Sequence, residues 1–239
     1  MEEYWSITEH YQFDEIFEAP HANLPETDEN HQDCSEFSRF RYHGMYTVIE
    51  NEWVEPLAKW INESLNSGVD YCIEVMSGRG WLAKALENNR VEIMATDDGS
   101  DYLHRSRELE YSVLITDAVY PVEKKSTDEV AKYITKIRQE EDKQCLVIIS
   151  YPPDDNVAFD FVNKLPDGTL IIYIGDEDFE LTASEEFGKA INWLNNNQHV
   201  NLPKSFQITN FPFLTVEGVG NDATVENTVI GSIMLGIKE

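Results

Sequence analysis

From residue 69 onward, short apolar runs alternate with stretches that have a helical period. The strand-like runs are YCIEVM (71–76), VEIMA (91–95), SVLIT (112–116), CLVIIS (145–150), TLIIYI (169–174), FQITNF (206–211) and VIGSIML (229–235). The middle runs are apolar at successive positions, which is typical of strands buried on both faces in a parallel sheet. The pattern therefore predicts parallel strands that alternate with helices.

Two helices are predicted from apolar spacing alone. Over 49–65 apolar residues recur every three or four positions, and the same spacing follows the first strand over 81–89. Pro56 lies inside the first of these stretches, where it predicts either a late start or a kink.

Two further helices are predicted from their start signals. Ser126 with Glu129 has the spacing of a capping box, in which the two side chains satisfy free backbone amides at a helix start. Thr182 with Glu185 has the same spacing and predicts a helix that runs to Leu194.

Together these elements predict an α/β fold. We expect a Rossmann-like, doubly wound, mostly parallel seven-stranded sheet with helices on both faces. The last two apolar runs have no helix between them, so the terminal strand should be antiparallel. Residues 1–47 are polar, acidic and without a clear period, and we interpret them as an acidic N-terminal arm or lid before a domain that spans 48–239.

The charge of the chain narrows its partners. Lys and Arg number 18 against 45 Asp and Glu, a net charge of −27, and no basic groove is evident. Such a surface repels phosphates, so we expect no nucleic-acid binding. Two meanings of the acidic surface remain open: solubility, or recognition of a basic protein partner. The chain lacks a long apolar run and an apolar leader, and its three cysteines are an odd number, so we expect a cytoplasmic protein without a membrane partner.

The candidate chemistry lies where the strands end, because ligands of open α/β sheets bind at the carboxyl ends of strands. After the first strand comes EVMSGRGW (74–81), whose glycines allow a tight turn close to a ligand. After the second strand comes Asp97, at the place where a carboxylate grips ribose hydroxyls. An ordinary strand-to-helix turn and a turn aspartate are the competing interpretations.

The next two strand ends add an acidic residue and a rigid turn. Asp117 follows the third predicted strand, where it is placed to accept from an exocyclic amine such as that of adenine. Tyr151, Pro152 and Pro153 follow the fourth, and two prolines fix the backbone in an extended turn that directs side chains into the cleft. A nicotinamide enzyme and a purely structural turn are the alternatives.

These four strand ends, EVMSGRGW, ATDD, TDA and ISYPPDD, resemble in type and order the class I S-adenosylmethionine-dependent methyltransferase superfamily over roughly residues 50–239. Met76 stands where that family has its first glycine. Tyr151 and Asp154 replace the residues on either side of the two prolines in members that methylate amino groups, so nucleobase methylation is not carried over. The resemblance implies S-adenosylmethionine as cofactor. Its implied binding residues are Glu74, Ser77, Gly78, Gly80, Asp97, Asp98, Asp117, Ala118 and Ser150.

The function expected from this resemblance is methyl transfer to a small molecule or a protein. We expect the acceptor between the Tyr151–Asn156 turn and the basic–aromatic cluster at 39–46, with Tyr151, Asp154 and His43 as candidate catalytic residues. No pattern predicts a metal site. The alternative is a non-catalytic module of the same fold that binds a protein through its acidic surface.

Overall fold

The computed structural model describes residues 45–100, 118–194, 211–212, 214–219 and 228–239. Within them the strands form one eight-stranded sheet, with the order β3-β2-β1-β4-β5-β8-β6 and with β7 paired to β8. The strands are β1 (Tyr71–Val75), β2 (Met94–Asp97), β3 (Val122–Lys124), β4 (Cys145–Ser150), β5 (Leu170–Gly175), β6 (Ile191–Trp193), β7 (Thr215–Val219) and β8 (Thr228–Lys238).

The direction of strand pairing makes this a doubly wound sheet. The pairs from β3 through β2, β1 and β4 to β5 are parallel, whereas β8 is antiparallel to β5, β6 and β7. The chain builds outward from β1 toward β3 and then crosses to β4, so the switch in strand order lies between β1 and β4. The expected Rossmann-like, mostly parallel sheet with an antiparallel terminal strand is confirmed, with eight described strands instead of seven.

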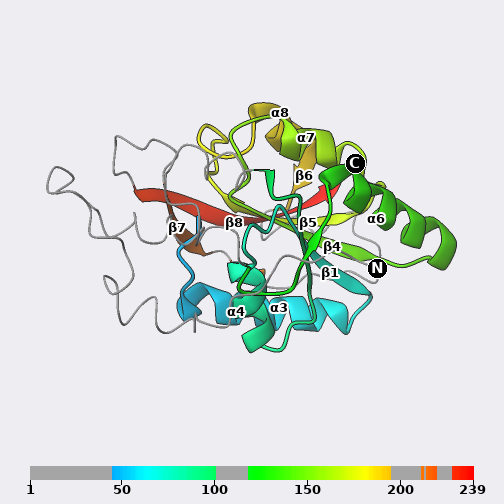
Figure 1. Ribbon diagram of the computed structural model, residues 1–239, viewed down its shortest axis with the longest axis horizontal. Helices are drawn as coiled ribbons and strands as arrows, with labels where there is room; N and C mark the ends of the chain where they lie inside the picture. Colours follow the sequence, from blue (N-terminus) through cyan, green and yellow to red (C-terminus); the bar gives the residue numbers. More distant parts are fainter. Residues whose placement is uncertain (1–44, 101–117, 195–210, 213, 220–227) are drawn as a thin grey trace, which may run out of the picture.

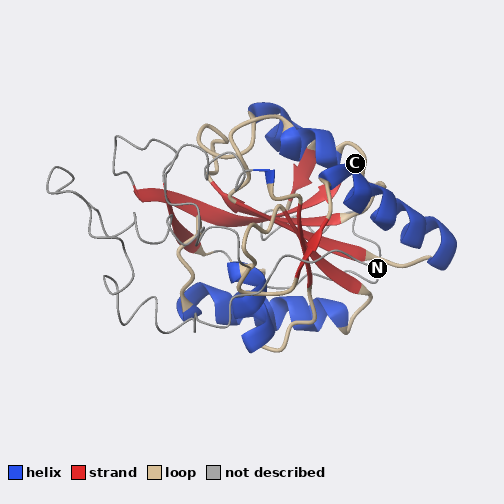
Figure 2. Cartoon of the chain, in the orientation of Figure 1, coloured by secondary structure: helices blue, strands red, loops and turns tan. Residues whose placement is uncertain are grey.

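Helices cover both faces of the sheet (Figures 1 and 2). On one side lie α3 (Asn51–Leu65) and α4 (Trp81–Asn88); on the other lie α6 (Thr127–Glu141), α7 (Val157–Val162) and α8 (Glu185–Lys189). Each layer has its own apolar core, one formed with α3 and α4 and one with α6, α7 and α8. Because both faces of β4 and β5 are covered, these strands are buried along almost their whole length.

Of the two helix starts predicted from capping signals, one is confirmed and one is wrong. The Ser126–Glu129 capping box is formed, with both reciprocal hydrogen bonds present. Pro56 lies within α3 without ending it. The helix expected from Thr182 to Leu194 is wrong: Ser184 is the N-cap, and α8 spans only five residues before β6 begins.

The hydroxyl of Thr182 explains this difference. Its Oγ1 lies 2.5 Å from the Tyr173 hydroxyl and accepts from the Asp176 amide at 3.0 Å, so it holds the loop after β5 and does not cap a helix. The Ser184 hydroxyl accepts from the Phe187 amide instead. The following residues then pair with β8, which overrides their apolar helical spacing.

The strand predictions differ from the structure at three places. The second strand begins at Met94 rather than at Val91. Val122–Lys124 pairs with β2, although its sequence carries no strand signal. Thr215–Val219, which lies between the last two apolar runs and was not expected as a strand, pairs with β8. The expected strand at 112–116 and all but the last residue of that at 206–211 lie outside the described residues.

Two further observations concern the expected environment. No helix within the described ranges is long and apolar enough to cross a bilayer. Cys72 and Cys145 are both buried free thiols.

Candidate functional site

A cavity of about 380 Å³ opens at the carboxyl ends of β1, β2 and β4, which include the two strands at the switch in strand order. This volume is within the range of small-molecule sites, and the position is where open α/β sheets bind ligands. Its walls come from the glycine turn after β1, the exit of β2, the double-proline turn after β4 and the segment before α3. Many of the lining residues carry polar groups. They include Thr47, Glu74, Ser77, Gly78, Asp97, Asp98, Lys125, Ser150, Tyr151, Asp154 and Asp155.

The backbone of the turn after β1 is left-handed at three alternate positions. Met76 has φ 56°, Gly78 has φ 58° and Gly80 has φ 81°. A left-handed backbone is disfavoured for a residue with a side chain, and such strain concentrates at functional sites. Met76 therefore has the backbone conformation typical of a glycine, while its side chain lines the cavity.

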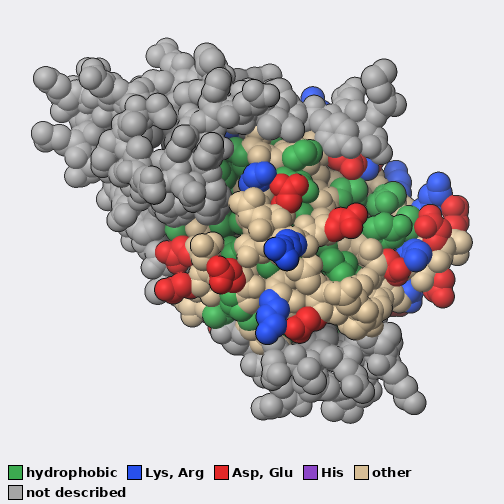
Figure 3. Space-filling model, turned by 90° about the horizontal axis from the view of Figure 1, so that it is seen from below, with side chains coloured by type: hydrophobic (Ala, Val, Ile, Leu, Met, Phe, Trp, Pro, Cys, Tyr) green, Lys and Arg blue, Asp and Glu red, His purple; other side chains and the backbone are tan. Residues whose placement is uncertain are grey.

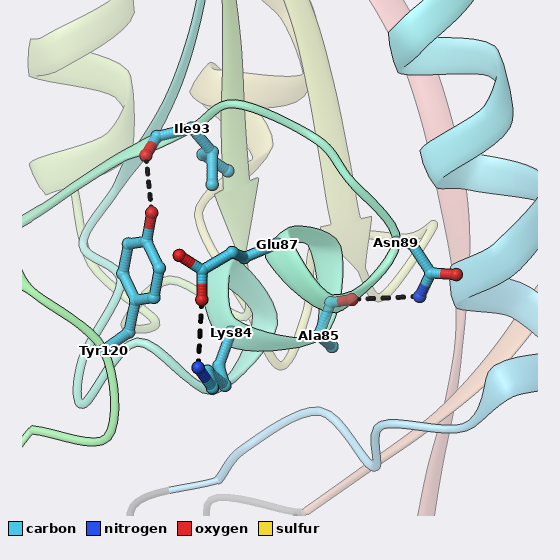
Figure 4. A network of polar contacts seen from close by, with 6 residues as sticks. All are labelled: Lys84, Ala85, Glu87, Asn89, Ile93 and Tyr120. Atoms are coloured by element: carbon cyan, nitrogen blue, oxygen red, sulfur yellow. Dashed lines mark hydrogen bonds and ion pairs between the residues drawn. The ribbon is translucent and has the colours of Figure 1, made fainter.

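Gly80 is required by close packing. A Cβ at this position would lie 2.8 Å from Tyr120 Cβ and 3.0 Å from Val122 Cγ2. The hydroxyl of Tyr120 donates to the Ile93 carbonyl at 2.9 Å, which ties the chain before β3 to the chain before β2 beside α4 (Figure 4). Gly80 is thus the N-cap of α4 and a packing position.

Asp97 joins the first two strand ends. Its Oδ2 accepts from the Gly78 amide at 2.9 Å, and its Oδ1 accepts from the Gly99 amide at 2.7 Å. Asp98 accepts from the Ser100 amide at 2.8 Å in a local turn. A carboxylate can accept about four hydrogen bonds. Asp97 can therefore accept from the two backbone amides and from ligand hydroxyls at the same time.

Glu74 is a carboxyl group at the back of the cavity. It is 2% exposed and accepts a hydrogen bond from the Ala83 amide in the first turn of α4. Its Oε2 is buried and has no hydrogen-bond partner in the described part of the chain, and the same holds for the hydroxyl of Ser77. Burial raises the pKa of Glu74 to about 8, and the nearby charge of Asp97 adds to this.

The turn after β4 provides the facing wall. Tyr151 has φ 44°, so the second strand at the switch also ends in a strained residue that is not glycine. Its amide donates to the Ile174 carbonyl at 2.8 Å, and the following Pro152 and Pro153 line the cavity with Asp154 and Asp155. A strained non-glycine residue thus follows each of the two strands at the switch; the other described ones are Arg90, Asp142, Phe179 and Ala183.

The segment before α3 closes the cavity from its remaining side. The hydroxyls of Thr47 and Ser150 lie 2.7 Å apart, which ties this segment to the end of β4. Met45 and Tyr46 also line the cavity, and Met45 is 1% exposed. The end of the cluster expected at 39–46 therefore lies beside the double-proline turn.

Most of the expected site residues meet here. Those that line the cavity are Glu74, Ser77, Gly78, Asp97, Asp98, Ser150, Tyr151 and Asp154. Gly80 supports the turn without lining the cavity, and Ala118 is packed in the core formed with α3 and α4. Asp117 and His43 lie outside the described residues. Tyr46 also lines the cavity, as part of the cluster expected at 39–46. Lys125, which lines it too, was missed, because it does not stand at a strand end expected from the sequence.

This chain resembles known proteins in structure but not in sequence. No protein-family model matches the chain, and no curated protein sequence matches it. The solved structures similar to it include three methyltransferases. The magnesium protoporphyrin IX methyltransferase of Synechocystis PCC 6803, with bound S-adenosylmethionine, has 9% identity and a TM-score of 0.41 over 88% of this chain and 94% of that chain.

The other two are O-methyltransferases. That of Bacillus cereus, in complex with S-adenosylhomocysteine, has 11% identity and a TM-score of 0.36 over 80% of this chain and 83% of that chain. The S-adenosylmethionine-dependent enzyme of Thermotoga maritima has 9% identity and a TM-score of 0.36 over 83% of this chain and 69% of that chain. At TM-scores this low, the fold assignment rests on the strand order of the sheet.

Proposed function

We propose that this protein binds S-adenosylmethionine in the cavity at the β1–β4 switch and transfers its methyl group to a small molecule or a protein. The observation that carries the proposal is the clamp between Asp97 and the amide of Gly78. It joins a glycine turn to a carboxylate at the end of the neighbouring strand. A glycine turn beside a carboxylate at the end of the neighbouring strand is typical of doubly wound sheets that bind nucleotide-type ligands.

The residues present fit this cofactor. Asp97 would accept from the ribose hydroxyls, and Gly78 and Ser77 would lie against the ligand backbone. Glu74 Oε2 and the Ser77 hydroxyl are buried polar atoms on the cavity wall that lack a partner among the described residues, as expected of groups that meet a polar ligand. Asp117 is proposed to face the adenine amine and Ala118 to support that side from the core.

Bound S-adenosylmethionine would supply an electrophilic methyl group, and this chain would supply orientation and a proton acceptor. An acceptor group that gains the methyl must release one proton if it was protonated. We assign Asp154, which is exposed on the cavity wall, to take up that proton. Tyr151 would orient the acceptor, and His43 is a second candidate base.

Binding of the cofactor is tested by isothermal titration calorimetry with S-adenosylmethionine and S-adenosylhomocysteine. We expect Asp97→Ala to weaken binding by about 1–3 kcal/mol, since ligand hydroxyls would lose a charged acceptor. Asp160→Ala is the matched control, because Asp160 is exposed on α7 and does not line the cavity. Absence of heat with wild-type protein at about millimolar ligand, an affinity near 4 kcal/mol, would exclude the proposal.

The second candidate function is a non-catalytic module that binds a basic protein partner through the acidic surface. The net charge of −27 favours it. Such a module need not bind the cofactor, so the same titration separates the two functions. On the face seen in Figure 3, acidic and basic side chains are interspersed over the described residues.

A further inference from the structure

We propose that this cavity selects its ligand by charge and binds S-adenosylmethionine, whose sulfur is cationic, more tightly than S-adenosylhomocysteine, whose sulfur is neutral. The inference rests on the proposed function and concerns which form of the adenosyl ligand the site holds. It follows from the charges on the cavity wall, from the pairing of its one lysine, and from the buried carboxyl at its back.

Acidic groups dominate the cavity wall. Its described lining contains five carboxyl groups, Glu74, Asp97, Asp98, Asp154 and Asp155, which come from the ends of β1, β2 and β4. They reach the cavity from three different strands and therefore surround it. Glu74 is protonated below its pKa of about 8, so the negative charge comes from the four aspartates at the ends of β2 and β4. A positive charge placed among these aspartates is attracted from both strand ends, and that attraction is stronger in a recessed site than in open water.

The one cationic side chain in the described lining does little to offset these charges. The Lys125 ammonium forms an ion pair with Glu123, which is not a lining residue, and lies 5.2 Å from the centre of the Tyr133 ring. The positive charge of Lys125 is thus partly offset by the Glu123 carboxylate. The field inside the cavity stays negative.

The buried carboxyl of Glu74 gives an independent sign that the cavity meets a ligand. Glu74 is only 2% exposed, and its Oε2 has no hydrogen-bond partner among the described residues. The groups that face it are the Ala83 amide and the titratable side chains of Asp97, Cys72 and Tyr120. All three side chains are neutral or negative, so a cationic ligand group is the partner that their field favours.

Charge selection has a consequence for turnover. Methyl transfer breaks the bond between the methyl carbon and sulfur and leaves the electron pair on sulfur, so the ligand loses its sulfonium charge while the acceptor gains the methyl. The wall that attracts the substrate form then holds the product form less tightly. Release of the product is thereby favoured, and the product competes for the site less well than the substrate form.

The test is calorimetric titration of wild-type protein with S-adenosylmethionine, S-adenosylhomocysteine and sinefungin, which carries an ammonium group near the position of the sulfonium. We expect both cationic ligands to bind at least about threefold more tightly than S-adenosylhomocysteine, and less selectively when NaCl is raised from about 50 to about 500 mM. In Asp154→Asn/Asp155→Asn this preference should fall toward one. The amide retains the acceptor oxygen that Asp155 offers to the Val157 amide at 2.8 Å. The control Asp160→Asn removes a charge from α7 outside the cavity and should leave the preference unchanged.

Each result decides a different point. Equal binding of the three ligands, or tighter binding of S-adenosylhomocysteine, overturns charge selection and leaves the proposed function standing. A preference that survives in the double variant overturns its assignment to Asp154 and Asp155. Binding of none of the ligands overturns the proposed function and this inference together.

Discussion

The left-handed backbone of Met76 predicts an inversion in the usual ranking of alanine and glycine. At most positions glycine is less stable than alanine, because its unfolded chain has more freedom. At φ 56°, however, any residue with a Cβ is strained by about 1–2 kcal/mol, and glycine is not. We therefore expect Met76→Gly to be more stable than Met76→Ala.

The magnitude follows from three contributions. Both variants lose the half-buried methionine side chain that packs against the core of α6, α7 and α8, at a cost of about 1–2 kcal/mol. Met76→Ala keeps the strain, whereas Met76→Gly relieves about 1–2 kcal/mol of it and forfeits about 0.5–1 kcal/mol to the unfolded state. At the middle of these ranges, glycine should exceed alanine by about 0.8 kcal/mol in the free energy of unfolding.

Urea denaturation followed by tryptophan fluorescence measures this difference. The control pair is Lys136→Ala and Lys136→Gly, since Lys136 is exposed within α6 and there glycine should be less stable by about 1 kcal/mol. If glycine ranks below alanine by the same amount at both positions, the left-handed backbone at Met76 does not strain the folded protein.

Two other predictions concern the walls of the cavity. Glu74 has a pKa of about 8 in the folded chain and an ordinary value of 4.5 when exposed, so the folded state holds a proton that the unfolded state releases, and stability falls as pH rises through that window. Glu74→Gln should therefore gain stability relative to wild type by up to about 1.4 kcal/mol per pH unit between pH 4.5 and pH 8, and parallel unfolding curves of the two proteins across that range would contradict this. Gly80→Ala should lower the free energy of unfolding by about 2 kcal/mol or more, since the alanine Cβ would lie 2.8 Å from Tyr120 Cβ at a left-handed backbone. Thermal unfolding measures this loss, and an unchanged melting temperature would show that the chain before β3 moves aside.

The sequence was sufficient where the signal is local. β4 was placed without error because six successive residues are suited to a strand that is buried on both faces. The capping box at Ser126 was equally reliable, because its two partners are three residues apart. The order of β1, β2 and β4 along the chain then placed Asp97, Glu74 and Tyr151 at a common edge.

The sequence was insufficient where the deciding contact is distant. The pairing of Val122–Lys124 depends on β2, and that of Ile191–Trp193 depends on β8. Nothing within either segment indicates its partner. The conformation of Met76 was likewise hidden, because a methionine in a sequence gives no sign that the surrounding fold imposes a glycine backbone on it.

The long strand β8 has a consequence for the order in which the protein is made. One edge of β8 pairs with β5 from Ser232 to Ile237, and its other edge carries β7 and β6 one after the other. A ribosome produces these residues after all the other described strands, so the nascent sheet ends at an open β5 edge whose residues are buried in the finished protein. Until residues 228–238 emerge, that edge can pair with any available strand, and a chaperone that shields it during synthesis would protect the chain from aggregation.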